Sequence, residues 1–143
     1  MKRIFVATLA IVTAWSSGWA NLGDNSDRID DIYGNLLQRQ LRDDGTVSVL
    51  YHKGQYLYLV TFANDRSISE SYSHMNGKDL SEKEIAGFLK RNAAGGTWIP
   101  ANTSKERRFK RSDDNAEATY GSTTGRRALT VRELSRKTAE RDQ

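Results

Sequence analysis

Hydrophobic and polar residues alternate along several segments in the middle of the chain, a pattern typical of β-strands. The strongest segment, 55–63 (QYLYLVTFA), is largely apolar on both alternating faces, as expected of a central strand. Segments 46–52 and 67–73 also alternate, and 36–41 is a further candidate strand. Turn sequences separate these segments at 43–45, 53–54 and 64–66. The pattern predicts an antiparallel meander of about four strands, with 67–73 at its edge.

Two other segments space their apolar residues as an amphipathic helix does. The first runs from Asn25 or Ser26 to Gly34, with apolar residues at positions i, i+3 and i+4. The second begins at Ser81-Glu82-Lys83-Glu84, a capping-box sequence, and ends near Asn92. The sequence therefore predicts an α+β fold in which an antiparallel β meander carries two helices on one face.

The start of the chain has the three parts of a secretory signal peptide. Lys2 and Arg3 precede the apolar run 4–14, and small residues lead up to Ala20. The run is shorter than the roughly 18 to 20 residues that a helix needs to span a bilayer. We expect cleavage after Ala20, which leaves a soluble periplasmic or secreted protein with no membrane span.

The amino-acid composition limits both the kinds of site that the protein can form and its cellular location. The chain has no cysteine, which excludes a thiolate metal site, a thiol nucleophile and a lipid-attachment cysteine in the sequence as it stands. Small secreted domains of eukaryotes usually depend on disulfides, so the bacterial envelope is the favoured location.

Charge divides the chain into two parts. Residues 21–104 carry 9 basic and 11 acidic residues, whereas residues 105–143 carry 11 basic and 7 acidic residues. Apolar periodicity also weakens after Ala101. We therefore expect a signal peptide over 1–20, an α+β domain over 21–104 and a basic, loosely ordered C-terminal extension over 105–143.

Four tyrosines on neighbouring predicted strands form the main candidate protein-binding set: Tyr51, Tyr56, Tyr58 and Tyr72. Tyrosines arranged in this way make recognition surfaces, because they offer contact area at low entropic cost. They also make the apolar layer beneath a pair of helices. The sequence leaves both interpretations open.

Four basic residues surround Phe109 and form the candidate anion-binding set: Arg107, Arg108, Lys110 and Arg111. Basic residues beside an aromatic ring hold phosphates, and anionic envelope polymer or lipid head groups are the anions that an exported protein meets. No nucleic acid is expected as a partner. An ordinary basic edge strand explains the same residues.

Histidine is scarce, and His52 and His74 are the only two in the chain. A small hydrolase would have to use one of them, since histidine is the usual proton-transfer group near neutral pH. Neither histidine has the spacing of a metal motif, and the serines of 67–71 alternate as exposed strand residues do. The sequence predicts no catalytic residue, no metal and no cofactor, and it keeps the hydrolase as an alternative.

The order of the first helix, the Leu50-Tyr51 strand, the 58–62 strand and the turn Asn64-Asp65-Arg66 resembles outer-membrane assembly lipoproteins of the SmpA/OmlA type. It is also similar to the β-lactamase-inhibitor-like periplasmic domains. The resemblance covers residues 23 to about 72 and implies a non-enzymatic domain that acts through protein contacts. The sequence thus favours an exported binding domain whose partner is an envelope protein. Attachment of the basic tail to anionic polymer or lipid is the alternative.

Overall fold

The computed structural model describes residues 22–122 and 125–134, and these residues form two short helices and one antiparallel sheet. The elements are, in chain order, α1 (Ser26–Tyr33), β1 (Leu36–Leu41), β2 (Val47–Lys53), β3 (Tyr56–Ala63), β4 (Arg66–His74), α2 (Glu82–Arg91), β5 (Trp98–Pro100), β6 (Arg107–Arg111), β7 (Ala116–Ser122) and β8 (Arg127–Glu133). The predicted signal peptide, 1–20, and the end of the predicted extension, 135–143, lie outside the described residues.

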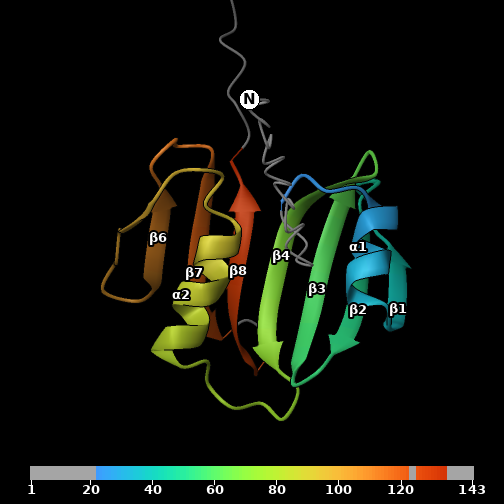
Figure 1. Cartoon of the computed structure of the whole chain (residues 1–143), viewed down its shortest axis with the longest axis horizontal. Helices are drawn as coiled ribbons and strands as arrows, with labels where there is room; N and C mark the ends of the chain where they lie inside the picture. The colour runs from blue at the N-terminus through green and yellow to red at the C-terminus, as the bar shows by residue number, and fades with distance from the viewer. Residues whose placement is uncertain (1–21, 123–124, 135–143) are drawn as a thin grey trace, which may run out of the picture.

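The sheet has eight strands in the order β1-β2-β3-β4-β8-β7-β6-β5 (Figure 1). The chain makes the same arrangement twice: a helix and then four strands, in an N-terminal half (α1 and β1–β4) and a C-terminal half (α2 and β5–β8). The halves join where β4 pairs antiparallel with β8, and Ser71 lies opposite Thr130 at this joint. One continuous sheet results.

The expected meander of about four strands with a basic extension is therefore wrong. The fold is mostly β, and residues 107–133 supply three strands of the same sheet as residues 36–74. Two of these strands, β6 and β7, bury few large apolar side chains: their buried residues are Phe109, Arg111, Ala116 and Ala118. Their hydrophobic signal is weak because the space above them is filled by α2 rather than by their own side chains.

The predicted edge strand at 67–73 is also in a different position. It forms most of β4, which pairs with β3 on one side and with β8 on the other. Ser69, Ser71 and Ser73 are partly accessible because that face of the sheet is open, not because the strand lies at an edge, whereas Ser67 is buried. The edges of the sheet are β1 and β5.

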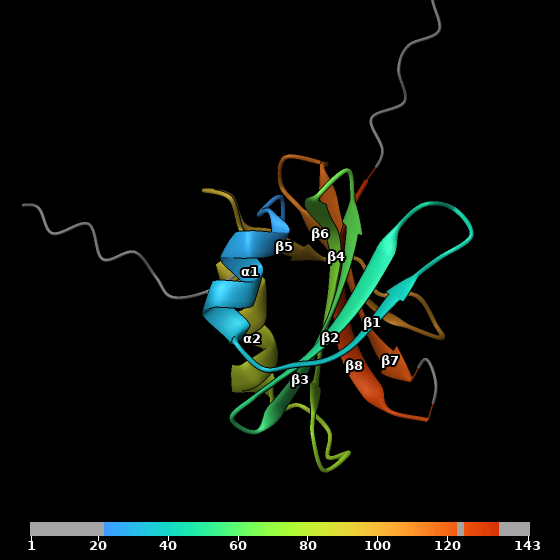
Figure 2. The same ribbon diagram turned by 90° about the vertical axis from the view of Figure 1, so that its right-hand side faces the viewer.

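Both helices lie on the same side of the sheet (Figure 2) and begin at the capping residues that the sequence indicates. The Asn25 side chain accepts a hydrogen bond from the Arg28 amide at 2.9 Å. Ser81 and Glu84 form a reciprocal capping box at the start of α2, and the helix ends at Asn92. Such caps satisfy amide groups that otherwise lack partners in the first turn.

The hydrophobic core lies between the helices and the sheet. Ile29 of α1 and Ile85, Phe88 and Leu89 of α2 are buried against strand residues. Phe88 stacks on Tyr72, with ring centroids 4.3 Å apart and an interplanar angle of 4°. The aromatic packing joins α2 to β4, so it crosses the joint between the two halves.

Candidate binding surface

The opposite side of the sheet forms an open face, because no described helix covers it (Figure 2). Strand register places Leu50, Leu59, Ser71, Thr130 and Thr119 in one row across β2, β3, β4, β8 and β7. All five side chains are at least partly accessible to solvent. The open face thus extends over both halves of the molecule.

The middle of the open face consists mainly of hydroxyl side chains. Ser71 and Thr130 share a hydrogen bond of 2.7 Å between their hydroxyl oxygens, directly at the joint of the two halves. Other hydroxyls on this face are Thr61, Ser69, Ser73 and Thr119. Short hydroxyl side chains leave the sheet surface flat and able to donate and accept hydrogen bonds.

The two ends of the open face differ in character. At the β2–β3 end, Leu50 and Leu57 are half-buried and Leu59 is 38% exposed. At the other end the side chains are charged, and the Arg132 guanidinium meets Glu117 at 2.6 Å. The face therefore offers an apolar patch, a hydroxyl-rich centre and a charged border.

The helices cover most of the tyrosine set that was the main candidate for protein binding. Tyr51 and Tyr72 are fully buried, Tyr58 is 5% exposed and Tyr56 is half-buried. Even-numbered residues of β3 face the helices, so its tyrosines become the layer between sheet and helices. Tyr33 of α1 stacks on Tyr58 with ring centroids 4.1 Å apart. Burial raises the pKa of Tyr72 and Tyr58, which keeps both phenols neutral.

A buried polar cluster lies beneath the helices, around Glu70. The Tyr72 hydroxyl donates to the Glu70 carboxylate and accepts from the Asn92 amide at 2.8 Å. The side-chain oxygen of Asn92 accepts a hydrogen bond from the backbone N–H of Leu22 at 3.0 Å. Burial raises the pKa of Glu70 to about 7, although the hydrogen bond from Tyr72 opposes the shift. The cluster ties β4, α2 and the segment before α1 together.

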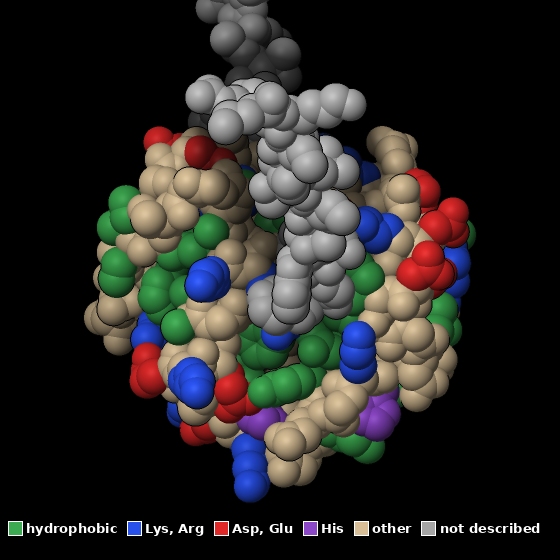
Figure 3. Space-filling model, in the orientation of Figure 1, with side chains coloured by type: hydrophobic (Ala, Val, Ile, Leu, Met, Phe, Trp, Pro, Cys, Tyr) green, Lys and Arg blue, Asp and Glu red, His purple; other side chains and the backbone are tan. Residues whose placement is uncertain are grey.

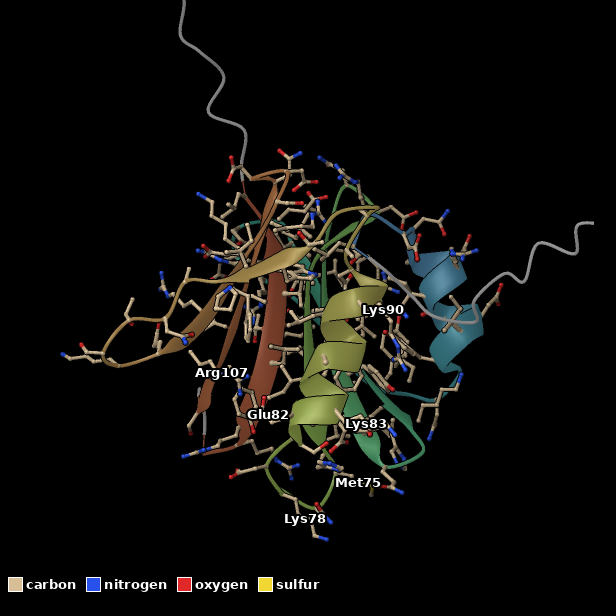
Figure 4. All side chains as sticks on the ribbon, turned by 60° about the vertical axis from the view of Figure 1, so that its left-hand side comes forward. Met75, Lys78, Glu82, Lys83, Lys90 and Arg107 are labelled. Carbon is tan, nitrogen blue, oxygen red and sulfur yellow. The ribbon has the colours of Figure 1, made fainter. Side chains whose placement is uncertain are left out.

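The predicted anion-binding residues are engaged with acidic groups of the protein. Figure 4 shows Arg107 of β6 beside Glu82 of α2, and its two terminal nitrogens reach the two carboxylate oxygens at 2.6 and 2.7 Å. The other pairs are Arg108 with Glu106 at 2.9 Å, Lys110 with Asp114 at 3.4 Å and Arg111 with Asp113 at 2.9 Å. Arg111 is also buried and donates to the Asn92 carbonyl at 2.9 Å. The four cations therefore have structural partners, and Figure 3 likewise shows basic and acidic side chains interspersed on the helix side.

The two histidines lie on opposite faces of the sheet. His52 is on the open face and contacts the Gly54 carbonyl at 2.9 Å. His74 is buried beside α2, where its Nε2 atom lies 2.8 Å from Glu84. Glu84 also accepts from the Tyr56 hydroxyl; desolvation raises the pKa of this carboxyl, but the hydrogen bonds outweigh it and lower the pKa to about 2. His74 and Glu84 thus act together as a link between β4 and α2.

Within residues 22–122 and 125–134, no three or more histidine and carboxylate side chains gather as a metal site would require. The same residues contain no helix of the length and apolarity needed to cross a membrane.

No family model and no curated protein matches this chain. One solved structure that is similar in shape is a cysteine-rich secretory protein from Staphylococcus aureus, at 12% identity and a TM-score of 0.44. The match covers 80% of this chain and 44% of that protein, so this chain spans less than half of its length.

Sequence reasoning missed the open face, although its signal is present. The serines at 69, 71 and 73 alternate with buried residues, and Thr119 and Thr130 do the same in the C-terminal half. A strand with one wet face fits an edge or a central position equally well. The pairing of β4 with β8 distinguishes a central position from an edge position, and it joins segments far apart in the sequence.

Proposed function

We propose that this protein is an exported, non-catalytic binding domain of the bacterial envelope that recognises another protein through the open face. The observation that carries the proposal is an accessible sheet face, continuous over both halves, with no described helix above it. Export and an envelope location are supported by the leader sequence and by the absence of cysteine. The resemblance to β-lactamase-inhibitor-like domains favours the same class of function.

The chemistry of the open face fits a folded protein surface better than a small ligand. Leu59 and its apolar neighbours favour binding because a partner would remove them from water. The hydroxyls around Ser71 can form hydrogen bonds, and their short side chains lose little conformational entropy on binding. A small molecule is usually enclosed in a concave pocket. This face is a broad β surface instead, so the partner's own surface has to provide the complementary shape.

Site-specific cross-linking in the envelope tests this function. A photoreactive residue replaces Leu59 on the open face and, in a matched control, Lys90 on the exposed side of α2. We expect one discrete protein product from position 59 and none from position 90. Leu59→Arg should lower capture of that product at least tenfold, about 1.4 kcal/mol, whereas Lys90→Ala should not.

Two results would contradict the proposal. One is cross-linking from position 90 but not from position 59. The other is retention that depends on the chain after residue 134 and disappears as salt rises, because that behaviour is characteristic of attachment to an anionic polymer or lipid.

A further inference from the structure

The two edges of the sheet differ in their capacity to accept another strand. β5 has three residues and includes Pro100, which has no backbone N–H to donate. β1 has six residues, none of them Gly or Pro, and all six are exposed. Its leucines, Leu36, Leu37 and Leu41, are 43%, 52% and 73% exposed. A register shift between Leu36 and Gln38 and the charge of Arg39 protect this edge only in part, because residues 38–41 pair regularly with β2 and remain exposed on their outer side. The exposed, leucine-bearing edge of β1 therefore indicates a pairing site.

The backbone of β1 is oriented for pairing. The Arg42 amide donates to the Thr46 carbonyl at 2.9 Å, so Arg42 and Thr46 form a hydrogen-bonded pair at the end of the β1–β2 ladder. Hydrogen-bonded pairs alternate in an antiparallel ladder, so Gln40 and Gln38 direct their backbone groups to β2. Arg39 and Leu41 therefore direct their N–H and C=O groups outward, away from the sheet.

The sequence of this edge reads the same in both directions. Residues 37–41 are Leu-Gln-Arg-Gln-Leu. If two copies pair antiparallel about a two-fold axis at Arg39, Leu37 meets Leu41 of the second copy and Gln38 meets its Gln40. The axis repeats each contact, as in any symmetric interface, and in this register each residue type also meets its own type. The same axis brings the outward backbone groups of Arg39 opposite one another.

Side-chain placement supports this register. Leu41 lies opposite Val47 and Arg39 opposite Val49, on the helix side, whereas Gln40 lies opposite Ser48 on the open face. A β1-to-β1 pair would therefore cover Leu41 on the helix side and align glutamine amides on the open face, while Leu37 lies at the register shift between Leu36 and Gln38. Glutamine amides donate and accept, so they satisfy one another across the pair.

The charge at the axis is also accommodated. Two Arg39 side chains would approach one another there, and like charges directly opposite are unfavourable. Arg39 lines a cavity of about 280 Å³ whose wall also contains Asp30 and Asp65. The two carboxylates line the same cavity as Arg39 and so offset part of the like charge that two copies would bring together.

We propose that the occupant of the β1 edge is a second copy of this chain, paired antiparallel about Arg39 to form a symmetric dimer with a continuous sheet. The dimer does not depend on the proposed function, because its contacts lie at the edge rather than at Leu59 and Ser71. It places two open faces on one assembly, which would allow bivalent binding.

Sedimentation of the purified exported protein over a concentration series tests the dimer. We expect the native chain to dimerise with a dissociation constant below roughly 1 mM, the weak limit of useful affinity. Two charge variants, Leu37→Lys with Leu41→Lys and Leu37→Glu with Leu41→Glu, should each weaken self-association at least about tenfold, because each register pair becomes two like charges.

An equal mixture of the two charge variants decides the register. Lysine at 37 then meets glutamate at 41 of the other variant, so the mixture should regain the dimer that each variant alone has lost. Both leucines are exposed, and circular dichroism of each variant checks that the fold is retained. A native chain that stays monomeric, charge variants that dimerise normally, or a mixture that does not reassociate would each overturn the proposal.

Discussion

The two halves of the sheet share one layout but fill the space beneath their helices differently. In the N-terminal half, α1 has 8 residues and covers large rings, among them Tyr51 and Tyr58. In the C-terminal half, α2 has 10 residues, β7 buries only the small Ala116 and Ala118, and Phe88 of α2 reaches across to stack on Tyr72. The N-terminal half combines large strand side chains with a shorter helix, and the C-terminal half combines small strand side chains with a longer helix. The same architecture therefore arises from dissimilar sequences.

The joint shows this difference at equivalent positions. Tyr72 follows Ser71 in β4, and Val131 follows Thr130 in β8. Glu70 precedes Ser71, whereas an apolar Leu129 precedes Thr130. The N-terminal half therefore contributes the aromatic ring and the buried carboxyl of the joint, and the C-terminal half contributes aliphatic filling. Unequal contributions mean that equivalent substitutions should have unequal effects.

The largest effect should come from Tyr72→Ala. It removes a fully buried ring that stacks on Phe88 and leaves Glu70 without its hydroxyl donor. We expect the free energy of unfolding to fall by about 3 to 5 kcal/mol. Val131→Ala, at the equivalent position, should cost about 2 kcal/mol. Urea denaturation measures both, and equal losses would show that the halves do not differ at the joint.

The next effect concerns pH and the buried carboxyl of Glu70. Its pKa rises from an ordinary 4.5 to about 7 on folding, so the native state holds a proton that the unfolded chain releases between these values. Stability should therefore fall as pH rises through this window and level off above it, by about 2 to 3 kcal/mol between pH 5 and pH 8.

Glu70→Gln separates this contribution from other titrating groups. Glutamine resembles the protonated acid and accepts from Tyr72, so the variant should lose most of the pH slope and be more stable than the native chain at pH 8. Denaturation at both pH values provides the measurement. A variant whose stability still falls as steeply as that of the native chain would assign the slope to other groups.

The smallest effect compares the two helix starts. Ser81→Ala removes the hydroxyl that accepts from the Glu84 amide at 3.1 Å and should cost about 1 kcal/mol. Asn25→Ala removes the cap of α1 and should cost a similar amount, whereas Ser81→Gly should cost only a few tenths. Thermal unfolding of the three variants checks the order, and a neutral Ser81→Ala would contradict the role of this cap.

The elements between residues 25 and 92 were largely predictable, whereas the architecture was not. Alternation at 55–63 and the capping box at 81–84 each reflect interactions between close neighbours in sequence, and both elements form as predicted. Three strands of the C-terminal half, β6 to β8, lie in the segment that the sequence predicted to be a loosely ordered extension. Their inward positions include Ala118 and Arg111, which give little hydrophobic contrast, beside apolar residues such as Leu129 and Val131.

The sequence by itself determined the local elements, the turns, the helix caps and the palindromic edge at 37–41, because each depends on residues close together in the chain. Tertiary structure decided what those elements do. Pairing of β4 with β8 made a central strand of a predicted edge and exposed its serines on the open face. Packing of α1 and α2 buried the tyrosines, since which face of a two-sided strand is covered depends on helices elsewhere in the chain.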